Sequence, residues 1–141
     1  MADSLERNLW SWLKRGTFRS RDLDMERVEN GVGDGTPDVD GCFEGVSFKI
    51  ELKIGTITIR ENLVRTKFRP MQLPWIKERT RVGGRVFVLL QIGRHRYLVA
   101  GKDCQQFKRK DLTLAELEKL AIVSPKCSQM DVLRACAHHP L

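Results

Sequence analysis

Hydrophobic and polar residues alternate strictly along the stretch from Val46 to Ile54. Every second residue is apolar, and the positions between them hold Ser47, Lys49, Glu51 and Lys53. A period of two, rich in aromatic and β-branched residues, predicts a β-strand with one buried face. The residues from Asp38 to Phe43 form a shorter candidate strand, and Glu44-Gly45 is typical of a two-residue turn. The pattern therefore predicts a β-hairpin.

The turn length fixes the register of this hairpin. If Glu44 and Gly45 are the two loop residues, Asp38 lies directly opposite Glu51. Opposed side chains have Cβ atoms about 4.5–5.5 Å apart. Lys53 follows two residues later on the face of Glu51. We therefore expect two carboxylates and one ammonium group to meet on the polar side of the hairpin.

The residues before the hairpin predict a helix and a short strand. Leu5, Leu9, Trp12 and Leu13 recur at helical spacing, which predicts a helix with Ser4 as its N-cap that ends near Gly16. Residues 25–30 are a candidate strand. The glycine-rich run 30–35 is expected to be a loop whose amides can approach a phosphate, but no Gly-Lys-Ser/Thr follows, so no nucleotide cofactor is predicted.

The residues after the hairpin predict a basic arm and a helix. The apolar pattern continues to Ile59, and residues 60–67 are expected to leave the sheet as an arm over the polar face. Pro70 favours the first turn of a helix that ends at Gly83-Gly84. The inner stripe of this helix is expected to hold Met71, Trp75, Ile76 and Arg79.

Two strands and several short helices complete the predicted chain. Residues 85–92 are almost all apolar, which is typical of a central strand covered on both faces, and residues 95–100 are its hairpin partner. Residues 103–107, 113–120 and 130–137 are predicted to be helical, and Thr113 with Glu116 forms a capping box. We expect one α/β domain over residues 1–141, with a mixed central sheet flanked by helices and a short helical C-terminal extension from about residue 103.

Charge points to a polyanionic partner. The 141 residues carry a net charge of +7. Most of the excess lies between Arg60 and Arg85, which suggests nucleic acid more than an acidic membrane, because no amphipathic anchor accompanies it. No stretch is apolar for long enough to cross a bilayer, the N-terminus is unlike a signal peptide, and the four cysteines lack zinc-ligand spacing. We therefore expect reduced thiols in a cytoplasmic protein.

The chemistry of the hairpin allows two interpretations. Two close carboxylates repel each other unless a cation lies between them, and oxygen-rich sites suit Mg²⁺ or Mn²⁺. A metal held there activates water, and Lys53 can orient that water or stabilise charge on a phosphoryl group. The alternative is a surface ladder of Asp, Lys and Glu ion pairs without catalytic function.

Several motifs resemble one nuclease superfamily. Pro37-Asp38 followed by Glu51-Leu52-Lys53 is similar to the bipartite signature of the PD-(D/E)xK nucleases. The run 35–38 before it, and Arg69-Pro70-Met71-Gln72 with Trp75 after it, resemble the VRR-NUC and Holliday-junction-resolvase-like branch, which includes phage members. The resemblance implies a restriction-endonuclease-like core over about residues 5–90.

The resemblance also implies roles for individual residues. Asp38, Glu51 and the Leu52 carbonyl would hold Mg²⁺ or Mn²⁺, while Lys53 activates the water and Gln72 assists. A further acidic residue completes the metal site in this branch; Glu6 is the candidate by position, and Glu26 and Glu29 remain open as alternatives.

The implied function is a metal-dependent DNA endonuclease acting on double-stranded or branched DNA. A homodimer is the implied assembly, since members of this branch often work as dimers, and the implied location is the host cytoplasm if a phage encodes the protein. The residues expected to bind DNA are the basic ones that follow the hairpin and lie on the next helix: Arg60, Arg65, Lys67, Arg69 and Lys77. Two alternatives stay open. One is a non-catalytic nucleic-acid-binding or virion-associated structural protein with a nuclease-like fold, and the other is an RNA-processing nuclease with the same site.

Overall fold

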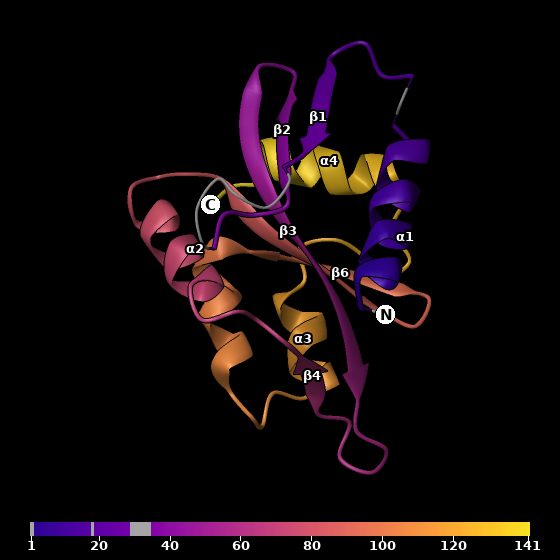
Figure 1. Ribbon diagram of the computed structural model, residues 1–141, viewed down its shortest axis with the longest axis vertical. Coiled ribbons are helices and arrows are strands. Elements are labelled where there is room, and N and C mark those ends of the chain that lie inside the picture. Colours follow the sequence, from indigo (N-terminus) through magenta and orange to yellow (C-terminus); the bar gives the residue numbers. More distant parts are fainter. Residues whose placement is uncertain (1, 18, 29–34) are drawn as a thin grey trace.

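A six-stranded mixed β-sheet organises the chain, and helices lie on both of its faces (Figure 1). The computed structural model describes residues 2–17, 19–28 and 35–141. The strands are β1 (Leu23–Arg27), β2 (Val39–Phe43), β3 (Val46–Ile57), β4 (Val64–Thr66), β5 (Val86–Ile92) and β6 (His95–Ala100). The helices are α1 (Ala2–Arg15), α2 (Gln72–Arg81), the 3₁₀ helix η1 (Gly101–Lys108), α3 (Leu114–Leu120) and α4 (Gln129–His138). The predicted mixed α/β class is confirmed.

The hairpin of β2 and β3 has the register expected from its turn. Val39 pairs with Ile50 and Phe43 with Val46 in an antiparallel ladder. The two turn residues both have positive φ, 51° at Glu44 and 82° at Gly45. Positive φ at both central residues is the geometry of the type I′ turn, whose twist matches that of the strands it joins.

The sheet becomes mixed because α2 carries the chain back to a parallel strand. The sheet order is β1-β2-β3-β5-β6, and β3 pairs with β5 in parallel while the other neighbours are antiparallel. Pro74 occupies the first turn of α2, where backbone N–H groups have no partner within the helix. At the other end Gly83 adopts a φ of 91°, which stops the helix as expected.

Two hydrophobic cores lie on opposite faces of the sheet. On one face Leu9 and Leu13 of α1 and Leu133 of α4 pack against inward residues of β2, β3 and β5. On the other face Ile76 of α2 and Leu117 of α3 pack with η1 against β5 and β6. The helices after residue 103 thus contribute buried side chains to both cores, and the predicted capping box at Thr113 is present at the start of α3.

Three local predictions are wrong. Helix α1 already begins at Ala2, so Ser4 is inside it and is not its N-cap. Residues 60–67 do not leave the sheet as an arm, because residues 64–66 form β4, which pairs with the end of β3. On α2 the buried residues are Gln72, Leu73 and Ile76, whereas Met71 is half exposed. The helix is rotated relative to the expected stripe because its apolar contacts are set by the sheet beneath it.

Within the described residues, no helix has both the length and the apolar character needed to cross a bilayer. The glycine-rich run expected to approach a phosphate lies outside the described residues except for Gly35.

Candidate active site

Two acidic residues and a lysine of the β2–β3 hairpin lie together. Asp38 immediately precedes β2, so one further step of the register places it opposite Glu51. Its Oδ2 accepts a hydrogen bond of 3.0 Å from the backbone N–H of Leu52. Glu51 and Lys53 are two residues apart on β3 and share a face of the sheet.

This group lies at a gap in the edge of β3. The last pair with β2 is Val39–Ile50, and the first pair with β4 on the same edge is Thr66–Gly55. The backbone between these pairs has no strand beside it within the described part of the chain. An extended residue directs its N–H and C=O toward the same edge, so the Leu52 carbonyl faces this gap beside the Asp38 carboxylate.

Gln72 connects the acid and the amine. Its Nε2 donates a hydrogen bond of 2.7 Å to Oε2 of Glu51, and its Oε1 accepts one of 2.7 Å from Nζ of Lys53. The backbone N–H of Arg69 donates to the same Oε1 at 2.8 Å. Gln72 is the first residue of α2, and α2 covers this face of the sheet. As a result Glu51, Lys53 and Gln72 are only 1%, 7% and 3% exposed, although the alternating pattern assigned Glu51 and Lys53 to a polar face.

The Glu51 carboxyl group strongly favours its protonated form. Burial raises the pKa of Glu51 to about 10, and the neighbouring Asp38 carboxylate adds to this rise. Its Oε1 is buried and has no hydrogen-bond partner among the described residues. Since burying a carboxylate without a partner is costly, this oxygen requires either a proton or a cation.

The Lys53 ammonium group is destabilised in turn. Burial lowers the pKa of Lys53, and the charge of Arg69 lowers it further, although the nearby carboxylates oppose this change. The Nζ also lies 4.7 Å from the centroid of the Phe68 ring. Lys53 is therefore held between an amide oxygen and an aromatic face, and it loses its proton at a lower pH than an exposed lysine does.

The structure places Glu6 near the group. Its charge raises the pKa values of both Glu51 and Lys53, so its carboxylate acts on them from α1. Glu26 is exposed on β1 opposite Asp40, one strand further from β3, and Glu29 lies outside the described residues. Among the described residues, no three His, Cys, Asp or Glu side chains come together as a set able to hold a metal.

Gly35 connects the Asp38 segment to the start of α2. Its φ is +86°, and a Cβ atom at this position would lie 2.3 Å from the carbonyl oxygen of Met71. Only glycine allows this approach, which holds the segment before Asp38 against the residue that precedes α2. The sequence placed this glycine in a loop approaching phosphate, and nothing in its pattern reveals the contact with Met71.

The basic residues expected to bind DNA are distributed over a wide surface. All five are exposed, and the charge of Arg69 acts directly on Lys53. Arg60 lies in the turn after Ile57, and Ile57 is about 13 Å of extended strand beyond Lys53. Arg65 lies on β4 and Lys67 between β4 and α2, while Lys77 lies on α2. Arg85, at the end of the same basic run, instead donates to three backbone carbonyls at the end of α4, those of Ala135, Cys136 and His139.

Comparison with models of known protein families finds no match, and comparison with curated proteins finds none either. Among solved structures, the chain is similar to Hjc of Archaeoglobus fulgidus, a Holliday junction resolvase from an archaeal hyperthermophile. The TM-score is 0.45 at 17% identity, over 71% of this chain and 77% of that chain. The function of this protein is therefore inferred from its own site.

The donor set of the site fits a hard divalent cation. Asp38 and Glu51 supply carboxylate oxygens, and the Leu52 carbonyl faces the same gap. Mg²⁺ and Mn²⁺ prefer such oxygen ligands and retain several waters, so a few protein ligands are sufficient. The unpartnered Oε1 of Glu51 is the atom that a cation would satisfy.

Proposed function

We propose that this protein is a metal-dependent endonuclease of the PD-(D/E)xK type that hydrolyses DNA phosphodiester bonds. The observation that carries the proposal is the Glu51 carboxylate, which is 1% exposed, has one unpartnered oxygen and faces Asp38 beside a buried lysine. An ion-pair ladder on the surface would not bury these groups. Burial at such cost is typical of a functional site.

Each side chain of the site has a separate role in hydrolysis. Asp38, Glu51 and the Leu52 carbonyl would hold Mg²⁺ or Mn²⁺, which supplies positive charge for the phosphoryl oxygens and acidifies water. Lys53, with its lowered pKa, orients the attacking water and accepts its proton. The water oxygen then bonds to phosphorus, the bond to the leaving oxygen breaks, and that oxygen takes a proton from solvent, to which Lys53 later releases the proton it accepted. Gln72 positions Lys53 through the bond to its Nζ.

We further propose that the substrate is branched DNA and that two copies of the chain act together. This part of the proposal is supported by the sequence motifs at residues 35–38 and 69–72, which resemble those of resolvase-like nucleases. A net charge of +7 favours such a polyanion.

A second candidate function is nucleic-acid binding without catalysis. One observation favours it: the described residues do not bring three acidic, His or Cys side chains together as metal ligands. In that case the buried pair, bridged by Gln72, would be a remnant of a catalytic site.

Cleavage assays test the proposal. A synthetic four-way junction and a linear duplex are incubated with Mn²⁺ and the parent, Asp38→Ala, Lys53→Ala or Asp40→Ala. Asp40 is the matched control, because it lies two residues after Asp38, on β2, but forms a surface ion pair of 3.1 Å with Lys49. We expect the parent and Asp40→Ala to cleave, and the other two to lose at least about 100-fold in rate.

The alternatives give different results in the same assay. If the parent binds the junction with a steep salt dependence but never cleaves it, the non-catalytic function is correct. An RNA junction of the same sequence separates an RNA-processing nuclease from a DNA-specific one.

A further inference from the structure

A basic pocket lies beside β4, separate from the group formed by Asp38, Glu51, Lys53 and Gln72. It has a volume of about 280 Å³ and is lined by β4, by Phe107 and Lys108 of η1, and by Arg109, Lys110 and Leu112 of the segment that connects η1 to α3. Four of the lining side chains are cationic: Arg65, Lys108, Arg109 and Lys110. Such a concentration of positive charge around one hollow is suited to an anion.

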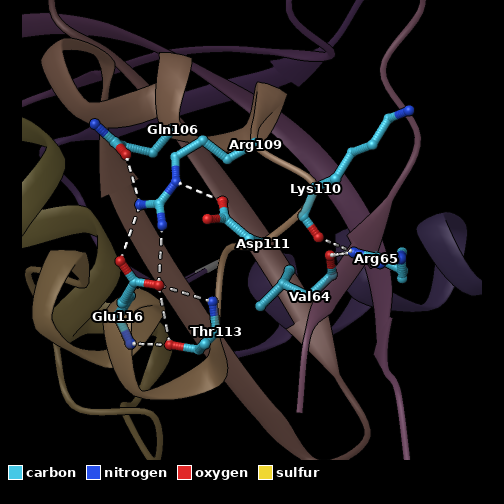
Figure 2. A network of polar contacts seen from close by, with 8 residues as sticks. All are labelled: Val64, Arg65, Gln106, Arg109, Lys110, Asp111, Thr113 and Glu116. Atoms are coloured by element: carbon cyan, nitrogen blue, oxygen red, sulfur yellow. Dashed lines mark hydrogen bonds and ion pairs between the residues drawn. The ribbon is translucent and has the colours of Figure 1, made fainter. Parts of the chain in front are cut away.

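Three of these side chains have no carboxylate partner among the residues that the structure describes. Figure 2 shows the guanidinium group of Arg109 directed at Asp111 and Glu116, with N–O distances of 3.0 and 2.9 Å. Arg65 instead donates to two neutral acceptors, the carbonyls of Val64 and Lys110, at 3.1 and 2.8 Å. Within the described chain, no carboxylate forms an ion pair with Arg65, Lys108 or Lys110.

The guanidinium group of Arg65 is held in place by these bonds. Its contact with the Lys110 carbonyl connects β4 to the segment between η1 and α3, so the two walls of the pocket are fixed relative to each other (Figure 2). Arg109 lies on the second wall, the segment between η1 and α3, and holds it in place by its bonds to Asp111, Glu116 and Gln106. A fixed arrangement of cations loses less entropy on binding an anion than flexible surface lysines do.

Two aromatic rings connect this pocket to the candidate active site. The Nζ of Lys53 lies 4.7 Å from the centroid of Phe68, and the rings of Phe68 and Phe107 are 5.4 Å apart. Phe107 itself lines the pocket. Successive phosphates of a DNA strand are separated by a rise of about 3.4 Å. A strand with one phosphate at Lys53 would therefore reach the pocket within a few nucleotides.

We infer that this pocket binds a non-bridging phosphate oxygen pair of the DNA backbone, on the strand whose scissile phosphate meets Glu51 and Lys53. The inference rests on the proposed function, and it adds two residues, Lys108 and Lys110, that lie outside the basic run between Arg60 and Arg85. Guanidinium and ammonium groups are the usual partners of phosphate. The bound strand then runs from Lys53 past Phe68 and Phe107 along β4.

The test compares DNA affinity in two double variants. Lys108→Gln/Lys110→Gln removes two charges of the pocket, whereas Lys119→Gln/Lys126→Gln removes two charges from exposed positions that do not line it. Arg65 is left intact, because its hydrogen bonds to two carbonyls also connect elements of the fold. The dissociation constant for a labelled DNA junction is measured at several salt concentrations, with Ca²⁺ replacing Mn²⁺, and the thermal unfolding of each variant is recorded.

We expect the pocket variant to bind about tenfold more weakly and its slope of log affinity against log salt to decrease in magnitude by about 0.9, the value for one lost phosphate contact. The control variant should stay within about twofold of the parent. If both double variants weaken binding equally, or neither does, the pocket is not a phosphate site.

Substitution of the DNA locates the contact. Single phosphates along the strand are replaced in turn by neutral methylphosphonate. One replacement, a few nucleotides from the cleaved bond, should weaken binding by the parent and have no effect on Lys108→Gln/Lys110→Gln. If every replacement affects the two proteins equally, the inference is overturned.

The outcome separates this inference from the proposed function. If the parent never cleaves DNA but only the pocket variant loses affinity, the phosphate site stands and the nuclease proposal fails. If the parent cleaves and the pocket variant has an unchanged affinity and salt slope, the nuclease proposal stands and the phosphate site fails.

Discussion

Gln72 donates a hydrogen bond of 2.7 Å from its Nε2 to Oε2 of Glu51, and thereby connects the first residue of α2 to the middle of β3. The same side chain accepts from Lys53 at 2.7 Å. One amide thus separates a buried acid from a buried amine and offers each a hydrogen-bonding partner. The arrangement explains how two ionisable groups remain on a face of the sheet that α2 covers.

Replacing this amide should destabilise the protein. Gln72→Ala leaves buried atoms of Glu51 and Lys53 without their partner, and each such loss costs about 1–3 kcal/mol. We expect the free energy of unfolding, measured by urea denaturation, to decrease by about 3 kcal/mol. Gln106→Ala is the control: it removes one exposed contact with Arg109 and should cost less than about 1 kcal/mol. Equal losses would mean that the Gln72 bonds add nothing to stability.

Metal binding should release a proton from Glu51. Because burial and Asp38 raise the pKa of Glu51 to about 10, the metal-free protein holds this proton at pH 7, whereas a bound cation requires the carboxylate. Titration calorimetry of Mn²⁺ in two buffers of different ionisation enthalpy should report about one proton released, and the affinity should rise about tenfold per pH unit. Glu51→Gln should abolish the release. Binding without proton release would contradict the raised pKa.

The raised pKa of Glu51 also sets the sign of the pH dependence of stability in the absence of metal. Between the unfolded value of 4.5 and the folded value of about 10, the folded protein holds the Glu51 proton and the unfolded chain does not. The Glu51 contribution to the free energy of unfolding therefore decreases as pH rises through this window, by up to about 1.4 kcal/mol per unit. Lys53 opposes this trend between its lowered pKa and 10.5. Urea denaturation in EDTA at pH 5 and pH 7 tests the net sign, and higher stability at pH 7 would contradict a dominant role for Glu51.

Lys53→Met should greatly reduce the cleavage rate and leave the stability of the fold nearly unchanged. Methionine keeps the packing against Phe68 and removes a cation that burial disfavours, and the protonated Glu51 does not need that charge at pH 7. We expect the unfolding free energy in EDTA to stay within about 1 kcal/mol of the parent or to rise, while single-turnover cleavage falls at least about 100-fold. A loss of more than about 2 kcal/mol would indicate that the ammonium group is needed by the fold.

Gly35→Ala tests the contact between the segment before Asp38 and the start of α2. Alanine is strained at a φ of +86°, and its Cβ would collide with the Met71 carbonyl. Gly45→Ala is a matched control, since its φ is +82° but nothing lies within 4 Å of the added atom. We expect a loss of about 1 kcal/mol for the control and at least about 3 kcal/mol for Gly35→Ala, with weaker Mn²⁺ binding in the latter alone. Similar losses in both variants would mean that the approach to Met71 is relieved at little cost.

Arg85→Ala should affect stability and leave DNA binding unchanged. The guanidinium group bonds to carbonyls at the end of α4, the nearest being that of Cys136 at 2.7 Å. We expect the unfolding free energy to fall by about 2 kcal/mol, with Arg85→Lys intermediate, and affinity for a DNA junction to stay within about twofold of the parent. A large loss of affinity in a folded variant would place Arg85 on the DNA-binding surface.

The sequence alone determined the hairpin and the residues it brings together. Alternation identifies β3, and a two-residue turn with positive φ at Glu44 and Gly45 fixes the pairing that sets Asp38 opposite Glu51, because a side-chain period of two leaves one register compatible with a buried face. Capping and turn residues likewise indicated the start of α3 and the end of α2, since these signals act over a few residues.

The tertiary structure decided the environment of those residues. Burial of Glu51 and Lys53, the rotation of α2 that turns Gln72 inward, the approach of Gly35 to Met71 and the pocket beside β4 all depend on contacts between segments far apart in the chain. A local pattern records which face of an element is apolar, but not which other element covers that face. A pKa or a binding pocket depends on this covering, so only the folded chain defines them.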